Sequence, residues 1–244
     1  MEQSKAIVLH QIKYSESSII LKVYTEREGL LSFIVKGVRG KKGKLRSAQF
    51  QTLNLINISY KKAKKSQLRN LLEVSVSEPF TDLLFDPIKR SVGIFTAELI
   101  QQSIREEETN KELFNFLYSS IHWLDLTKQN CSHFHLLFMM KLTKYLGFSP
   151  RMEDYSEKGC FDLQQGVFTL NRPPHLYYVD SQELIAWKQL FDTKLESLDG
   201  LKFSNSLKRS LVQSLMIYYK LHLAHFKELN SHQVLHAVFN DEKT

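Results

Sequence analysis

Positive side chains gather in two short segments of the first third of the chain, and these residues are suited to binding an anion. The first segment, residues 35–47, reads VKGVRGKKGKLRS, and the second is KKAKK at 61–65. Neither contains an acid, so their charges cannot pair locally and repel one another unless an anion is bound. We therefore predict a nucleic-acid-binding surface made of Lys36, Arg39, Lys41, Lys42, Lys44, Arg46, Lys61, Lys62, Lys64 and Lys65.

Glycines at 37, 40 and 43 suit the first segment to phosphate binding, because they let backbone N–H groups approach an anion closely. The segment lacks the Gly-Lys-Ser/Thr ending of a nucleotide-binding phosphate loop. Cations without a recognition helix contact the phosphate backbone rather than base edges. The pattern favours a sequence-indifferent clamp, and the alternative is a solvated basic turn.

Aromatic residues in the same part of the chain are candidate platforms for stacking against bases. A stacked base is worth roughly 1–3 kcal/mol. The candidates are Tyr14, Tyr24, Phe33, Phe50 and Tyr60. Most of them are expected to lie in the hydrophobic core instead.

Charge is distributed unevenly along the chain. Its formal net charge is +7, yet the first 80 residues carry 15 Lys and Arg against 6 Asp and Glu, and the rest carry 18 against 20. The whole positive excess lies in the first third, which favours a nucleic acid or an anionic membrane surface as partner. No apolar run approaches the ~20 residues of a membrane span. We expect a cytoplasmic protein without a membrane role.

Enzyme motifs are absent from the sequence, which contains no phosphate loop, nucleophile elbow, HExxH or dinucleotide fingerprint. His222 and His225, followed by His232 and His236, have spacings that could place imidazoles on one helix face, as a metal-dependent hydrolase needs. Core packing is the favoured interpretation, because no third type of ligand is indicated locally. We therefore predict no enzyme activity, no catalytic residue, no metal and no cofactor.

The first 79 residues have the alternating pattern of β-strands. Strands are predicted within residues 18–25, 30–37, 48–62 and 68–80. The alternation shifts phase after Leu55, which indicates a β-bulge, and the series closes with Leu72, Val74 and Val76 on one face. Four or five strands in roughly 75 residues, without helices between them, predict a small closed or partly open barrel.

After Pro79 the spacing of apolar residues becomes helical. Helices are predicted at 88–105, 113–126, 133–146, 181–191, 206–226 and 231–239. Residues 150–175 show little periodicity and indicate a loop with a short hairpin at 159–170. The predicted fold class is α+β in two domains, a β-barrel over 1–79 and an α-helical domain over 80–244.

Four short motifs stand in order along the first 50 residues. They are Val8-Leu9, Tyr14 with Glu16, Thr25-Glu26 with Gly29, and Lys36-Gly37-Val38-Arg39. Together with the later segments FTAELIQQSI, LFNFLYSSIHWLD and KYLGFSP, they resemble the RecO family of bacterial DNA repair and recombination mediators. The resemblance covers most of the chain, and is diffuse after residue 180.

This resemblance implies an N-terminal OB-fold that binds single- and double-stranded DNA, followed by an α-helical domain. It implies a mediator of the RecF-type pathway that anneals complementary strands and acts with RecR and the C-terminal tail of single-stranded DNA-binding protein, which helps to load RecA. A nucleoid-associated location in the cytoplasm follows. The alternative is an RNA-binding or ribosome-associated OB-fold protein.

Residues 150–175 depart from a pattern common in the family, in which four cysteines after an LGF-x-P turn bind zinc. This chain has only Cys160 there, and Arg151 to Asp154 stand where the first ligands would fall. We expect a zinc-finger-like segment that lacks the zinc cysteines and is held by packing. Gly43 stands where the family often has Ser, so no hydroxyl–phosphate contact is expected at that position.

The acidic and apolar tail of a partner needs an apolar pocket rimmed by cations. The segment KLTKYLGFSPR offers such a set at a helix end, so the candidate partner-binding residues are Lys141, Lys144, Phe148 and Arg151. The alternative is a buried Phe148 with solvated lysines around it.

Overall fold

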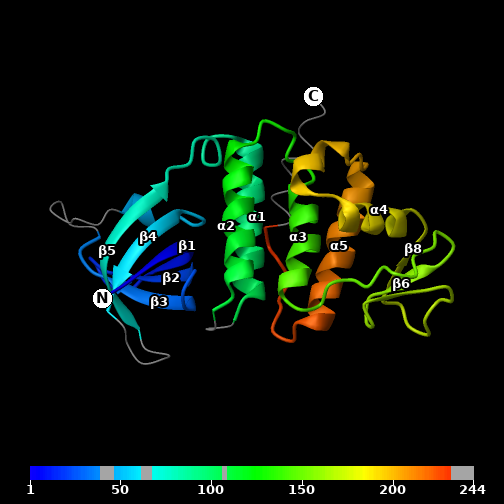
Figure 1. Ribbon diagram of the computed structural model, residues 1–244, viewed down its shortest axis with the longest axis horizontal. Helices are drawn as coiled ribbons and strands as arrows, with labels where there is room; N and C mark the ends of the chain where they lie inside the picture. Colours follow the sequence, from blue (N-terminus) through cyan, green and yellow to red (C-terminus); the bar gives the residue numbers. More distant parts are fainter. Residues whose placement is uncertain (39–46, 62–67, 106–108, 232–244) are drawn as a thin grey trace. The chain divides into compact units, whose positions relative to one another are not determined.

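The structure is a computed structural model, and it describes residues 1–38, 47–61, 68–105 and 109–231 (Figure 1). Packing divides the chain into two compact units. The barrel unit comprises Met1–Leu84 and Ile104–Leu126, and the helical unit comprises Phe85–Ser103 and Thr127–Thr244. The fold is α+β, as the sequence predicts, whereas a domain boundary between residues 79 and 80 stays a prediction.

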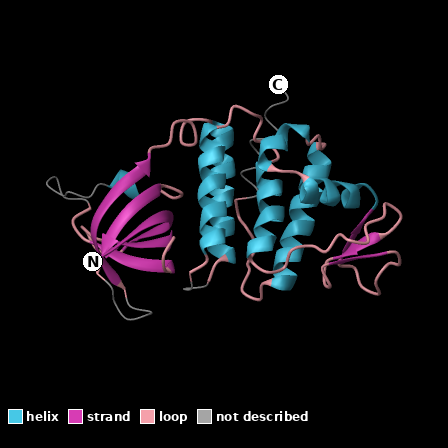
Figure 2. Cartoon of the chain, viewed as in Figure 1, coloured by secondary structure: helices cyan, strands magenta, loops and turns pink. Residues whose placement is uncertain are grey.

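Five strands close into a barrel, which confirms the β-barrel prediction (Figure 2). They are β1 (Glu2–Lys13), β2 (Ile19–Thr25), β3 (Gly29–Val35), β4 (Leu55–Tyr60) and β5 (Arg69–Glu78). Their order around the barrel is β1-β2-β3-β5-β4, and β4 pairs back onto β1. The neighbours are antiparallel except for β3 and β5, which run parallel. The barrel closes between β3 and β5 through two paired positions, Phe33 with Arg69 and Ile34 with Asn70.

Every second side chain of β2 and β3 points into the barrel interior. Leu21 and Val23 of β2 belong to this core, as the alternation predicts. Phe33, Phe50 and Tyr60 lie there too, and the Phe33 and Tyr60 rings meet edge to face with centroids 5.3 Å apart. These three aromatic candidates are therefore barrel core and not stacking platforms.

The segment 48–62 is not the single bulged strand that its pattern predicts. Ser47–Phe50 forms a short 3-10 helix, η1, and the strand begins only at Leu55. Two hydrogen bonds from the Asn54 side chain, to the carbonyls of Ala48 (3.0 Å) and Gln49 (3.1 Å), stabilise the turn between them. The irregularity predicted after Leu55 is confirmed, because the register between β4 and β5 shifts between Leu55 and Ile56.

Leu72 does not face the interior as the sequence predicts. The register between β4 and β5 shifts between Ser59 and Tyr60, so that Tyr60 pairs with Leu71 and Ser59 with Glu73. Leu71 therefore belongs to the core, and Leu72 is 40% exposed. Val74 and Val76 pack against the core as expected. A bulge depends on the partner strand, which explains why alternation along one strand misses it.

Helix α2 (Lys111–Leu126) belongs to the barrel unit. Ile7, Tyr24 and Leu30 are paired across β1, β2 and β3, lie outside the barrel core cluster, and are buried. The ring of Tyr24 stacks on that of Phe114 with centroids 6.4 Å apart. We call Ile7, Tyr24 and Leu30 the covered row.

Asp125, near the end of α2, fastens this helix to the segment after β5. Its carboxylate accepts hydrogen bonds from the backbone N–H groups of Thr81, Asp82 and Leu83, and from the Thr81 hydroxyl, at 2.7–3.1 Å. Burial alone would raise the pKa of Asp125, but these donors together hold that pKa below its usual value. The ionised carboxylate is therefore part of the fold of the barrel unit.

The helical unit contains four α-helices among the described residues, in the order that the sequence predicts. They are α1 (Pro87–Ser103), α3 (Phe134–Tyr145), α4 (Ser181–Asp192) and α5 (Asn205–His222), with a 3-10 segment η2 at Leu195–Gly200. The helix predicted at 231–239 lies outside the described residues except for its first position. Over the part of the chain that the structure describes, no helix is both long and apolar enough to span a bilayer.

The zinc-finger-like segment contains a small antiparallel sheet. The strands are β6 (Cys160–Asp162), β7 (Val167–Thr169) and β8 (Tyr178–Asp180), in the order β7-β6-β8. The hairpin of β6 and β7 confirms the prediction, whereas the sequence did not indicate β8. A Cβ on Gly159 would lie 2.5 Å from a Phe168 ring carbon, and the Phe161 ring lies 5.2 Å from that of Trp187. Close aromatic packing thus holds the segment.

Candidate nucleic-acid interface

The ten cations predicted from the sequence are only partly within the described structure. Lys36 directly follows β3 and Lys61 directly follows β4, and both are exposed. The other eight lie outside the described residues: Arg39, Lys41, Lys42, Lys44, Arg46, Lys62, Lys64 and Lys65. Both basic segments therefore start from the barrel, and their role stays a prediction.

Two rows of side chains cross the outer surface of β1, β2 and β3 beside the covered row. The cross-strand partners Ile12, Ile20 and Ile34 form the first, which we call the isoleucine row. The second row consists of His10, Lys22 and Ser32, which are likewise paired across the three strands. Directly paired residues share one face of a sheet. In β2 and β3 they alternate with core residues, so both rows point outward.

The isoleucine row is unusually open for apolar side chains. Ile12 is 52% exposed, and Ile20 and Ile34 are half-buried. Tyr14, two residues beyond Ile12, begins the β1–β2 turn and is 61% exposed. Sequence reasoning named Tyr14 but missed the isoleucine row. The signal was present, since placing Ile19 and Leu21 inward also places Ile20 outward.

Cations flank the isoleucine row on this surface. Lys22 stands in the neighbouring row, and Lys36 lies two residues beyond Ile34 at the start of the first basic segment. Glu16, in the β1–β2 turn, is exposed and opposes anion binding at that end. The surface of β1, β2 and β3 thus combines open apolar side chains with positive charge.

Arg69 does not contribute to this positive surface, although it begins β5. Its guanidinium is buried and donates to both carboxylate oxygens of Glu28, at 2.9 and 3.0 Å. The Tyr60 hydroxyl donates to Glu28 at 2.7 Å, and burial, with this contact, raises the pKa of Tyr60. Tyr60 therefore remains protonated, and the Arg69 charge is neutralised inside the barrel unit.

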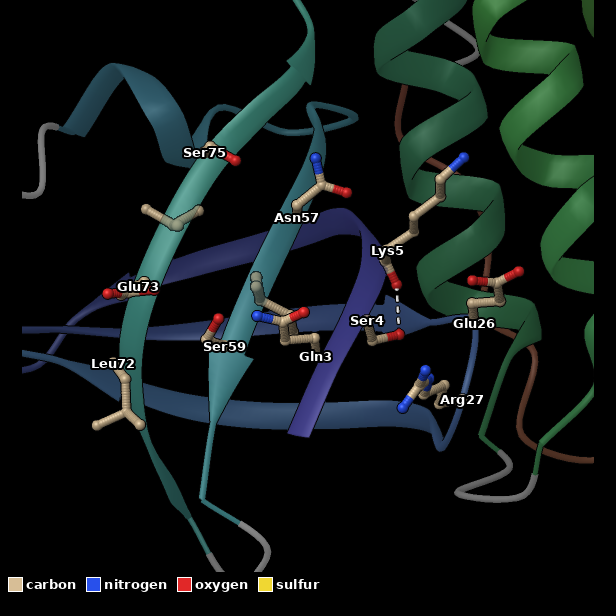
Figure 3. A pocket seen from close by; sticks show the side chains of 12 residues that line it. Gln3, Ser4, Lys5, Glu26, Arg27, Asn57, Ser59, Leu72, Glu73 and Ser75 are labelled. Atoms are coloured by element: carbon tan, nitrogen blue, oxygen red, sulfur yellow. Dashed lines mark hydrogen bonds between the residues drawn. The ribbon is translucent and has the colours of Figure 1, made fainter. Parts of the chain in front are cut away.

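A polar concavity of about 660 Å³ lies on another outer surface of the barrel, over β1, β4, β5 and the β2–β3 turn (Figure 3). It is lined by Gln3, Ser4, Lys5, Glu26, Arg27, Asn57, Ile58, Ser59, Leu72, Glu73, Val74 and Ser75. Its two cations, Lys5 and Arg27, are matched by Glu26 and Glu73, and Arg27 also lies 3.7 Å from Glu2. This balance of charge does not favour a polyanion.

The candidate partner-binding residues have different environments in the helical unit. Lys141 donates to the carbonyl of Phe191 at 2.5 Å, and burial lowers the pKa of Lys141. Phe148 is half-buried and its ring is stacked parallel to that of His222, with centroids 5.3 Å apart. Lys144 and Arg151 are exposed. Lys141 is thus engaged within the fold, and the partner-binding role of the set stays a prediction.

The histidines considered as metal ligands are used in packing where the structure describes them. The Nε2 atom of His222 hydrogen-bonds to the carbonyl of Leu163 at 2.9 Å, and His225 is half-buried. His232 and His236 lie outside the described residues. Among the described residues, no three His, Cys, Asp or Glu side chains gather in a group that could hold a metal ion.

Comparisons with known proteins cover both parts of the chain. The family model "Recombination protein O N terminal" matches residues 1–80, and "Recombination protein O C terminal" matches 84–231. A protein of Bacteroides fragilis named DNA repair protein RecO is 34% identical over 241 residues, which is 98% of this chain and 100% of the relative. Its namesake in Flavobacterium psychrophilum is 35% identical over 98% of this chain and 99% of the relative. Because the two models together match most of the chain and the relatives align with 98% of it, the chain belongs to the RecO family.

Proposed function

We propose that this protein is a recombination mediator of bacterial DNA repair that binds single- and double-stranded DNA without sequence preference. One observation carries the proposal. The 80 residues matched by the N-terminal RecO model are the same 80 that contain the whole positive excess of the chain. A folded barrel with both basic segments on it supplies cations for phosphates without a helix that could read base edges.

Annealing of complementary strands follows from charge neutralisation. Two single strands repel through their phosphates, and Lys and Arg side chains that neutralise both strands allow base pairing to nucleate. No covalent bond is made or broken, so the activity needs no catalytic residue. Affinity for a single strand should fall with salt, with a log–log slope of about −0.7 for each phosphate neutralised.

Partners complete the proposed role of the protein. We assign to it RecR, the C-terminal tail of single-stranded DNA-binding protein and, indirectly, RecA, at the nucleoid in the cytoplasm. Lys144 and Arg151 are exposed cations on either side of the half-buried Phe148 in the chain, which supports an acidic and apolar tail as the ligand of this segment. Lys141 would act by holding α3 to the end of α4 through Phe191.

The DNA-binding proposal is tested by reversing charges in the first basic segment. In the variant Lys41→Glu, Lys42→Glu and Lys44→Glu, we expect annealing of complementary oligonucleotides to slow at least tenfold and DNA affinity to fall in parallel, because six units of charge change at the phosphate site. The matched control changes three exposed lysines of the helical unit, Lys158, Lys202 and Lys227, to Glu. Equal behaviour of the two triple variants would contradict the proposal.

Competition experiments separate DNA from RNA as the ligand. Unlabelled RNA of equal length and sequence should displace bound single-stranded DNA no better than DNA itself. A protein built to read RNA would prefer the RNA, because the 2′-hydroxyl offers a further donor and acceptor. A clear preference for RNA would replace the proposed function by an RNA-binding one.

The partner site is tested with a labelled peptide that has an acidic and apolar C-terminus. Lys144→Glu with Arg151→Glu should weaken peptide binding about tenfold, because like charges would then meet at the site. Lys158→Glu with Lys227→Glu makes the same change of net charge at other exposed positions of the helical unit. An equal loss in both double variants would show a general charge effect and remove the assignment.

A further inference from the structure

We propose that residues 170–177, which connect β7 to β8, form a rigid apolar anchor that docks into an apolar pocket of a folded protein partner. We call these residues the crossover loop. The inference rests on the proposed function for the identity of that partner, which is RecR. It gives the zinc-finger-like segment a role separate from DNA binding by the barrel and from the candidate partner-binding residues.

The crossover loop exposes large apolar side chains. Leu176 is 91% exposed, Leu170 is 70% exposed and Tyr177 is 44% exposed. Single apolar residues on a surface are ordinary, but these three lie within one short loop. Tyrosine is also among the residues that are enriched where the binding energy of protein interfaces is concentrated. The loop therefore has the composition of an interface anchor.

The strand order β7-β6-β8 means that the crossover loop connects the two outer strands past β6, which lies between them. Helices cover one face of this small sheet, because the Phe161 ring of β6 lies 5.2 Å from that of Trp187 in α4 and 5.8 Å from that of Tyr218 in α5. Cys160 and Asp162 precede and follow Phe161, so their side chains point to the opposite face. The contacts of these two residues show where the loop runs.

Polar contacts fix the crossover loop to that opposite face. The Cys160 thiol donates to the carbonyl of Asn171 at 3.6 Å. A carboxylate oxygen of Asp162 lies 3.4 Å from the Nε2 atom of His175. The backbone N–H of Tyr177 donates to Nδ1 of the same imidazole at 3.2 Å, so His175 bridges the strand and the loop. Because the underside of the loop is used for polar contacts, its apolar side chains are left on the outside.

Two further contacts hold the crossover loop near its ends. The backbone N–H of Leu163 donates to the carbonyl of Tyr177 at 2.9 Å, and the Arg172 guanidinium donates to the Asp180 carboxylate at 2.8 Å. A loop that is already ordered loses little conformational entropy when it binds, so more of the contact energy appears as affinity. The exposed side chains are thus presented in a preorganised arrangement.

Charge complementarity selects a folded protein as the occupant. Arg172 is the one Lys or Arg residue of the crossover loop, and Asp180 matches its charge. DNA phosphates, or the acidic tail of single-stranded DNA-binding protein, would find no unmatched Lys or Arg on the loop and would meet Asp162 and Asp180 beside it. An apolar pocket gains from Leu170 and Leu176 and needs no countercharge. RecR is the folded protein that the proposed function places in direct contact with this chain.

Binding of purified RecR to surface variants of the full chain tests the inference. Leu170→Ser with Leu176→Ser should weaken RecR binding about tenfold and leave DNA affinity unchanged, because two apolar anchors are lost at a site that does not contact DNA. Leu176→Met keeps an apolar side chain and should bind RecR like the wild type. The matched control, Phe85→Ser with Ile94→Ser, removes two exposed apolar side chains elsewhere in the helical unit and should bind RecR normally. Equal losses in the two double variants would overturn the inference.

The contribution of preorganisation is tested by His175→Ala, which leaves both exposed leucines in place. The backbone N–H of Tyr177 loses its acceptor and Asp162 loses its neighbour. We therefore expect the Tyr177 amide hydrogen to exchange faster and RecR binding to weaken about threefold. Faster exchange with unchanged RecR affinity would contradict a rigid anchor.

Photocrosslinking locates the contact independently of affinity. A photoreactive benzophenone amino acid in place of Leu176 should crosslink to RecR, whereas the same replacement of Ile94 should not. Crosslinks from position 176 to DNA or to a second copy of this chain, without crosslinks to RecR, would assign the loop to another partner and overturn the inference.

Failure of the inference can be distinguished from failure of the proposed function. If the wild type binds RecR and Leu170→Ser with Leu176→Ser binds it equally well, the anchor is wrong while the RecR partnership stands. If the wild type does not bind RecR at all, the partnership and the anchor are both wrong, whereas the DNA-binding proposal keeps its own test. An unchanged far-ultraviolet circular dichroism spectrum in each variant excludes unfolding as the cause.

Discussion

The outer surface of β1, β2 and β3 and the outer surface of β1, β4 and β5 belong to one barrel and share a strand, yet they differ in chemistry. The first carries the isoleucine row beside Lys22 and Lys36. The second is the polar concavity, whose lining contains two cations and two acids. The positive excess of the barrel unit is therefore not spread evenly over its described surface.

Strand β1 contributes to both surfaces because it is long and irregular. Its first half pairs with β4 through residues 2–7, and residues 6–13 pair with β2, with a register shift between Val8 and His10. A bulge of this kind bends a strand and turns its side chains to another side. The difference teaches that a basic barrel can have one outer surface flanked by cations and another of balanced charge.

The largest effect is expected from removing the carboxylate that fastens α2, since α2 packs on the covered row through Phe114 and Tyr24. Asp125→Ala should lower the free energy of unfolding by about 3 kcal/mol, because three backbone N–H groups, including that of the buried Leu83, lose their acceptor. Urea unfolding measures this change. Hydrogen exchange should rise in α2 and around Tyr24. Asp154→Ala, at an exposed position, is the control and should be neutral.

The same carboxylate predicts a dependence of stability on pH. Its pKa is lowered in the folded state, so its contribution is present above the unfolded-state value of about 3.9 and is lost as pH falls through the lower folded value. The stability difference between the wild type and Asp125→Asn should therefore be constant from pH 7 to about pH 5 and shrink below that. A difference that grows on acidification would contradict the assigned ionisation.

Charge reversal on the open surface should have the next largest effect. Lys22→Glu with Lys36→Glu should weaken binding of single-stranded DNA on the order of 30-fold and reduce the salt slope by about 1.4, because two phosphate contacts are lost. Titrations at several salt concentrations measure both quantities. A lower affinity with an unchanged slope would mean that these lysines do not contact phosphates.

The smallest effect is expected on the polar concavity. Lys5→Glu changes the same type of charge, but at a site that already holds Glu26 and Glu73, so single-strand affinity should fall less than about threefold. The measurement is the same salt titration. If Lys5→Glu weakened binding as much as Lys22→Glu alone, the two surfaces would not differ toward DNA, and the comparison would fail.

Much of the fold could be predicted because it depends on local patterns. The core positions Leu21 and Val23 follow from alternation, and the hairpin at 159–170 follows from its turn. The exposed Leu72, the strand β8 and the packing of α2 on the barrel could not be predicted in this way. Each of these depends on a partner segment distant in the sequence, which periodicity along one segment does not contain.

The features of the candidate site also divide into those that local sequence patterns predict and those that depend on distant segments. By itself, the sequence determined that the positive excess lies in the first 80 residues, that these residues form strands, and that the chain resembles the RecO family. Only the tertiary structure decided that Ile12, Ile20 and Ile34 stand side by side, that α2 covers Tyr24, and that Arg69 is neutralised. Composition and periodicity are properties of one segment, whereas neighbours on a surface are set by the register between strands.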